Sequence, residues 1–132
     1  MRLHHETLQS IIGWTTREYS INRDAIFLLG FSQTVSLNYR FAFTHPGVIR
    51  GIVAVCGGIP GDWDQDKYKA SPTDILITAG ENDEFYPLGR TRGFKSALAR
   101  RAGSVEYHSF RGGHVFHNES LGLINEWLTA RI

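Results

Sequence analysis

The sequence predicts an α/β protein with a parallel sheet of about four strands flanked by helices. Short apolar runs rich in Val and Ile recur along the chain, and such runs are typical of strands buried on both faces. Segments with helical periodicity alternate with them, which favours parallel strands joined by right-handed crossovers. The length of 132 residues suits one domain, which we expect to span residues 1–132.

The predicted elements follow the order α-β-α-β-β-α-β-α. Helices are expected at residues 2–19, 33–44, about 88–102 and around 121–128. Strands are expected at residues 25–29, 49–56, 75–79 and 105–110. Residues 59–73 are rich in Pro, Gly and Asp, and we interpret them as a loop with at most one helical turn.

Composition and charge exclude several classes of function. The net charge is +1 and the basic residues are scattered, so we expect neither nucleic acid nor an anionic membrane as a partner. The longest apolar stretches are too short to span a membrane, and the first residues lack the apolar core of a secretion signal. The single cysteine, Cys56, excludes an internal disulfide, and we interpret it as a buried structural thiol. We therefore expect a cytoplasmic protein.

A serine follows the first predicted strand in a characteristic context. Residues 30–34 read Gly-Phe-Ser-Gln-Thr between a strand and a helix, which matches the G-x-S-x-G nucleophile elbow except at Thr34. The elbow's sharp turn would expose the hydroxyl of Ser32, and the backbone N–H of Gln33 would bind an oxyanion. The alternative is that Ser32 only caps the helix that follows it.

Acidic residues follow the third predicted strand. A carboxylate at this point can orient an imidazole as the third member of a catalytic triad. Asp83 has the spacing from the strand that a triad acid requires. Glu81 and Glu84 are interpreted as caps and dipole partners of the next helix.

Histidines cluster near the last predicted strand. His114 lies in a glycine-rich loop after that strand and can reach the nucleophile, while His117 is the competing base. Three histidines, with His108 inside the strand, also raise the possibility of a metal site. No cysteine or carboxylate joins them at ligand spacing and no HExxH motif is present, so we expect no metal.

The three candidates are consistent with one another. Ser32, Asp83 and His114 each follow a predicted parallel strand, where active sites of open α/β sheets lie, and they keep the chain order of α/β hydrolases. Two more motifs accompany these residues: the run ending in Cys-Gly-Gly at 56–58 and the segment 80–87. With them, the chain resembles the C-terminal part of the carboxylesterase/phospholipase family of α/β hydrolases from about residue 21 onward.

The resemblance implies hydrolysis of short-chain carboxylic esters through a Ser-His-Asp triad and an acyl-enzyme on Ser32, without a metal or organic cofactor. Ile59, Trp63 and Tyr86 lie on loops at the same end of the sheet and are candidates for lining an acyl pocket. Plain loop packing is the alternative for these three. Thioesterases, lysophospholipases and peptidases share this machinery, so acyl and alcohol specificity stay open.

Two departures from the family pattern affect these expectations. The β-branched Thr34 is expected to crowd the elbow. The N-terminal strands of the family fold are absent, which predicts a truncated α/β-hydrolase fold without the loop that donates the second oxyanion N–H. The apolar edge of the strand 25–29 would then be bare, and we expect a homo-oligomer or a partner to cover it.

Two functions of other classes stay open beside the enzyme. One is a truncated, hydrolase-like domain with little or no activity. The other is an α/β module that binds an anion at the helix N-terminus after Ser32.

Overall fold

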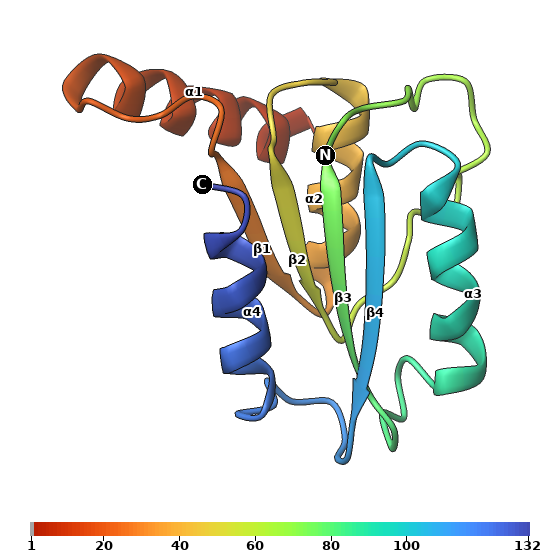
Figure 1. Ribbon diagram of the computed structural model, residues 1–132. Helices are drawn as coiled ribbons and strands as arrows, with labels where there is room; N and C mark the ends of the chain where they lie inside the picture. The colour runs from red at the N-terminus through yellow and green to blue at the C-terminus, as the bar shows by residue number, and fades with distance from the viewer. Residues whose placement is uncertain (1) are drawn as a thin grey trace.

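The computed structural model describes residues 2–132 and contains one parallel sheet in the order β1-β2-β3-β4 (Figure 1). The strands are β1 (Phe27–Phe31), β2 (Gly51–Val55), β3 (Asp74–Gly80) and β4 (Ser104–Phe110). The helices are α1 (Arg2–Glu18), α2 (Gln33–Thr44), α3 (Leu88–Ala99) and α4 (Ser120–Thr129). The predicted fold class, a parallel four-stranded sheet flanked by helices, is confirmed, and residues 59–73 form a loop with turns.

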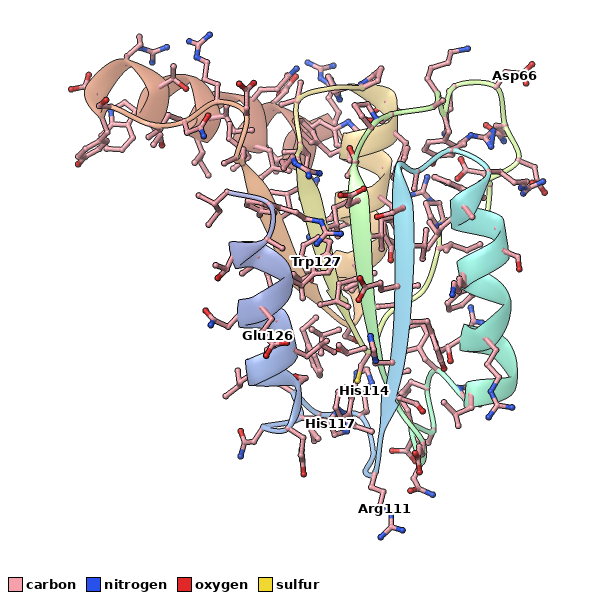
Figure 2. All side chains as sticks on the ribbon, viewed as in Figure 1. Asp66, Arg111, His114, His117, Glu126 and Trp127 are labelled. Atoms are coloured by element: carbon pink, nitrogen blue, oxygen red, sulfur yellow. The ribbon has the colours of Figure 1, made fainter. Side chains whose placement is uncertain are left out.

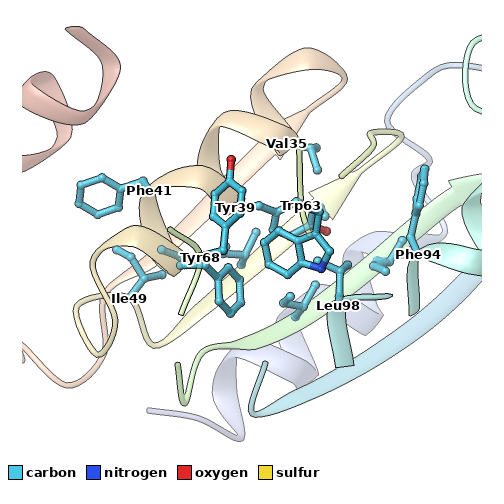
Figure 3. Packing of buried hydrophobic residues seen from close by; sticks show 14 residues of the cluster. Val35, Tyr39, Phe41, Ile49, Trp63, Tyr68, Phe94 and Leu98 are labelled. Atoms are coloured by element: carbon cyan, nitrogen blue, oxygen red, sulfur yellow. The ribbon is translucent and has the colours of Figure 1, made fainter. Parts of the chain in front are cut away.

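Alternating residues of the central strands pack into two hydrophobic layers. Ile52 on β2 and Ile75 on β3 belong to the layer that α2 and α3 cover, together with Phe94 and Leu98 of α3 (Figure 3). Val53 and Leu76 point the other way, into the layer that α4 covers with Ile124 and Trp127. Because both faces are covered, every residue of β2 is buried, as its continuous apolar run predicts.

The outer strand β1 differs from the prediction in position and in burial. It starts and ends two residues later than the predicted 25–29, because the ladder with β2 continues through Gly30↔Ala54 and Phe31↔Val55. The expectation that this run is buried on both faces is wrong: Leu29 is 54% exposed. β1 has a neighbour on one side only, so the described chain leaves its other edge uncovered.

Helix α1 lies apart from the two layers. It runs past β1 at the amino end of the strands (Figure 1), and none of its residues is buried. Leu8 and Ile12 pack against the rim of the core, while Ile11 and Trp14 are more than half exposed. Within residues 2–132 no helix has the length and apolar character needed to cross a membrane.

Candidate active site

The nucleophile candidate Ser32 lies in a sharp turn between β1 and α2. Its backbone has φ 60° and ψ −123°, a conformation that costs a non-glycine residue on the order of 1–3 kcal/mol. The Ser32 N–H donates to the carbonyl of Val55 on β2 at 2.9 Å, which fixes the turn to the sheet. Ser32 occupies the N-cap position of α2, yet its hydroxyl makes no capping hydrogen bond.

The residues around this turn explain how the strand and helix approach each other. A Cβ added to Gly30 would lie 2.8 Å from Asn38 Nδ2 and 3.2 Å from the backbone carbon of Thr34, so a larger residue would require Asn38 and the start of α2 to shift. The expectation that Thr34 crowds the elbow is wrong, because its side chain is exposed. Its hydroxyl accepts the N–H of Phe31 at 2.9 Å and donates to the Phe31 carbonyl at 2.8 Å.

Asp83 is held rigidly in the loop after β3. Its side chain is fully buried, and Oδ1 accepts the backbone N–H groups of Phe85 at 2.9 Å and Tyr86 at 3.0 Å. Burial acts to raise the pKa of Asp83, but the hydrogen bonds from His114 and from the Tyr86 and Phe85 amides outweigh it and hold the pKa below its ordinary value. Glu81 and Glu84 are exposed.

His114 bridges the other two candidates. Its Nδ1 lies 2.9 Å from Asp83 Oδ2 and its Nε2 lies 2.9 Å from the Ser32 hydroxyl. An ionised carboxylate can only accept a hydrogen bond, so Nδ1 carries the proton and Nε2 accepts the Ser32 O–H. The structure therefore brings the three sequence-predicted residues into one continuous hydrogen-bond chain.

The loops that carry Asp83 and His114 are joined to each other. The N–H of Glu81 donates to the Phe110 carbonyl at 2.8 Å, and that of Asn82 donates to the Gly112 carbonyl at 2.9 Å. The His114 loop crosses so closely over β3 that a Cβ on Gly80 would lie 2.3 Å from the Gly113 carbonyl. The glycines at these points allow the crossing that brings His114 to Asp83.

Three aromatic rings surround the His114 imidazole. The centroids of the Phe31 and Phe85 rings lie 4.9 Å from that of His114, and the Tyr86 ring stacks on it at 5.9 Å. Phe31 and Phe85 are 37% and 60% exposed, so they form an apolar rim beside the hydrogen-bonded Ser32 and His114. Tyr86 was expected here from the sequence; the two phenylalanines were not, although both are adjacent to motif residues.

Of the other two pocket candidates, Trp63 lies away from the site. Trp63 is buried in the core, where its ring contacts Phe43 and Tyr68 and its indole N–H donates to the Ala97 carbonyl at 2.9 Å (Figure 3). Because these contacts lie at the far ends of α2 and α3 from Ser32, the structure does not bring Trp63 to the site. Ile59 is partly buried against the same core.

The other histidines make separate contacts. His117 is buried and stacks on Phe110 with a centroid distance of 5.9 Å, while His108 on β4 faces Glu106 at 3.4 Å. Figure 2 shows His114 and His117 toward the end of the sheet where the loops after the strands gather. Within the described residues, the potential metal-ligand group combines His114 with Cys56 and Asp83 rather than with the other histidines.

Comparisons with known proteins identify a family that matches almost the whole chain. The model of the Phospholipase/Carboxylesterase family matches residues 3–132. A probable carboxylesterase SOBER1-like protein of Arabidopsis thaliana is 27% identical over 116 residues, which are 85% of this chain and 44% of that protein.

Solved structures share the fold at lower identity. The carboxylesterase of Bacillus cereus superposes with a TM-score of 0.81 at 19% identity, covering 97% of this chain and 60% of that one. SOBER1 of Arabidopsis thaliana superposes with a TM-score of 0.79 at 21% identity, covering 96% and 62%. The chain thus spans less than two thirds of the length of these relatives, and the fold it shares with them is truncated.

Proposed function

The chain belongs to the phospholipase/carboxylesterase family of α/β hydrolases, and on that premise we propose that it hydrolyses short-chain carboxylic esters with Ser32 as nucleophile, His114 as general base and Asp83 as the orienting acid. The observation that carries the proposal is the unbroken hydrogen-bond chain Ser32–His114–Asp83, with both links at 2.9 Å. A second support is the strained backbone of Ser32, because outliers of this kind concentrate at functional sites.

The first half of the reaction acylates the serine. His114 Nε2 takes the Ser32 proton as Oγ attacks the ester carbonyl carbon, and the carbonyl oxygen becomes an oxyanion. The backbone N–H of Gln33 is our candidate donor to this oxyanion, since the first N–H groups of α2 have no acceptor within the helix. Collapse of the intermediate breaks the bond to the alkoxide, which takes the proton from His114 and leaves as the alcohol.

The second half restores the enzyme. A water molecule gives a proton to His114 Nε2 and attacks the acyl carbon, and the acid leaves as Ser32 recovers its proton. Throughout, Asp83 accepts the Nδ1 hydrogen and stabilises the imidazolium that forms twice. The lowered pKa of Asp83 supports this role, because the group stays ionised at neutral pH.

The surroundings of His114 favour an apolar acyl or alcohol group. Tyr86, Phe31 and Phe85 lie around the imidazole, and two of these rings are accessible to solvent. We propose that this rim, rather than Trp63, contacts the substrate next to the scissile bond.

The proposal is tested by labelling the nucleophile. The purified chain is treated with a fluorophosphonate, its intact mass is measured and the adduct is mapped by peptide sequencing. We expect one adduct on Ser32, none in Ser32→Ala, and turnover of a chromogenic short-chain ester by the wild type only. Ser36 is a matched control, because it lies on α2 one turn further on and its hydroxyl bonds to the Gln33 carbonyl: Ser36→Ala should label like the wild type.

Two results would contradict the proposal. Equal ester turnover by the wild type and Ser32→Ala would remove Ser32 from the mechanism. No labelling and no turnover by a folded chain would favour the hydrolase-like domain without activity, and thermal stabilisation by phosphate without labelling would favour the anion-binding module.

A further inference from the structure

Cys56 shares an unusual backbone conformation with the proposed nucleophile. Among the described residues, two that are not glycine have positive φ: Ser32 at 60° and Cys56 at 49°. They follow the neighbouring strands β1 and β2, and a Cβ added to Gly57 would lie 2.7 Å from the Ser32 carbonyl oxygen. The structure therefore holds two strained residues side by side at the same end of the sheet.

The thiol of Cys56 reaches the two other members of the triad. It is 1% exposed, and its sulfur lies within 4.8 Å of ligand atoms of both Asp83 and His114. Its S–H donates to the carbonyl of Val115 at 3.3 Å, which is the residue directly after His114. The Cys56 side chain thus contacts the loop that carries His114 and lies beside the Asp83 carboxylate.

The thiol has the protonation state that such a contact needs. Burial raises the pKa of Cys56 to about 11, and the negative charge of Asp83 acts in the same direction. At neutral pH the group is a neutral S–H donor and not a thiolate, so it has no nucleophilic role.

We propose that Cys56 is a positioning residue of the triad: its S–H holds the carbonyl of Val115, and its sulfur keeps water away from Asp83. The first contact fixes the backbone next to His114 and thereby the angle of the imidazole. The second keeps the carboxylate dry, which strengthens its hydrogen bond with Nδ1. This inference rests on the proposed hydrolase function of the same site.

The test compares three substitutions of one residue. Cys56→Ala removes the donor and opens space beside Asp83, so we expect kcat to fall about tenfold with KM within about twofold of the wild type. Cys56→Ser keeps a donor and should recover most of kcat. Cys56→Gly relieves the positive φ while removing the thiol, so it should fold well and still lose as much kcat as Cys56→Ala. Val53→Ala is the control, because it trims the same face of β2 within the layer covered by α4.

The decisive readouts report on His114 directly. The acid limb of the pH profile of kcat/KM should shift in Cys56→Ala and Cys56→Gly but not in Val53→Ala. The NMR resonance of the Nδ1 proton, expected far downfield in the wild type, should weaken in the same two variants as water reaches Asp83.

The outcomes separate this inference from the proposed function. If Cys56→Gly folds and keeps the wild-type kcat, acid limb and Nδ1 resonance, the inference is overturned. If Val53→Ala changes these readouts as much as Cys56→Ala does, loss of packing explains the effect and the inference is again overturned. If the wild type shows no turnover, the proposed function fails, yet the Nδ1 resonance in the wild type and Cys56→Gly still decides the role of the thiol.

Discussion

The carboxyl end of the sheet and the outer side formed by α1 and β1 differ in burial and in hydrogen bonding. At the carboxyl end, the Asp83 side chain is fully buried and each ring nitrogen of His114 has a partner. At the outer side no residue of α1 is buried, and Leu29 and Trp14 are more than half exposed. An apolar groove of about 510 Å³ separates α1 from β1.

This difference shows which features of the site depend on the described chain alone. Ser32, Asp83 and His114 lie in the turns after β1, β3 and β4, and the ladder with β2 and the paired loops hold those turns in place. The hydrogen-bond chain of these three residues therefore does not require the groove between α1 and β1 to be filled. Under the proposed function, we expect completion of the oxyanion site and enclosure of a substrate to depend on the open side.

The largest expected effect comes from breaking the triad at its buried acid. Asp83→Asn keeps the side-chain shape, but an amide disfavours the tautomer with the proton on Nδ1, so we expect kcat to fall by a factor on the order of 10³–10⁴. Ester turnover measured beside Ser32→Ala checks this. Glu84→Gln is the matched control, because that neighbour is exposed and should leave kcat unchanged. A loss in kcat of less than tenfold in Asp83→Asn would show that the carboxyl end of the sheet is not the catalytic one.

The next effect contrasts stability on the two sides. Leu76 is completely buried on β3, and Leu76→Ala should lower the free energy of unfolding by about 2–5 kcal/mol. Ile11 on α1 is 53% exposed, and Ile11→Ala should change it by less than about 0.5 kcal/mol. Urea unfolding of both variants measures the contrast. Comparable losses would mean that α1 is covered in solution and that the two sides do not differ in packing.

The carboxyl end of the sheet is also the region that sequence patterns predicted well. The β2 and β3 runs are buried on both faces, so their local composition reflects their environment and indicates them as strands. Ser32 directly follows β1, and Asp83 and His114 lie in the loops after β3 and β4. Parallel topology alone brings such positions to one end of a sheet. The parallel sheet and the meeting of these three residues at one end of it could therefore be expected from the sequence.

The features that sequence patterns missed depend on contacts between distant segments. The end of β1 at Phe31 is set by pairing with Val55, and the burial of Trp63 is set by Phe43 and Ala97, which no local pattern reveals. Thr34 was misjudged because its β-branch argues for crowding, whereas the open side of the elbow leaves room for its hydroxyl to bond to the Phe31 backbone. The exposure of Leu29 was missed because an apolar run alone does not encode whether both faces of an outer strand are covered.

A smaller effect is expected on how the free energy of unfolding depends on pH, through Asp83 at the carboxyl end of the sheet. Because the folded state holds the pKa of Asp83 below the ordinary value of 3.8, this group stabilises the fold above that value, and the contribution is lost as pH falls through the lowered pKa. We expect unfolding free energy to decline below pH 3.8 less steeply in Asp83→Asn than in the wild type. Urea unfolding across the acid range measures both slopes, and equal slopes would mean that Asp83 is not ionised and bonded in the folded state.

The Thr34 hydroxyl offers a finer test where the two regions meet. Thr34→Val keeps the shape of the side chain but leaves the Phe31 N–H and carbonyl without their partner, so we expect a loss of about 0.5–1.5 kcal/mol and slower fluorophosphonate labelling of Ser32. Thr34→Ser retains the hydroxyl and should label at nearly the wild-type rate. Equal labelling rates in all three proteins would mean that the reactivity of Ser32 does not depend on this hydroxyl.

The smallest effect on folding is expected at the bare edge of β1, where we propose that a second copy or another protein covers the strand. An unpaired apolar edge is a template for association, and a lysine on it opposes pairing. Leu29→Lys should therefore change the unfolding free energy by less than about 0.5 kcal/mol, since the side chain is already 54% exposed. Sedimentation velocity should find the wild type above its monomer mass of 14.9 kDa and Leu29→Lys shifted toward it. A monodisperse wild-type monomer would contradict self-association and would mean that the exposed side of this chain is stable in water by itself.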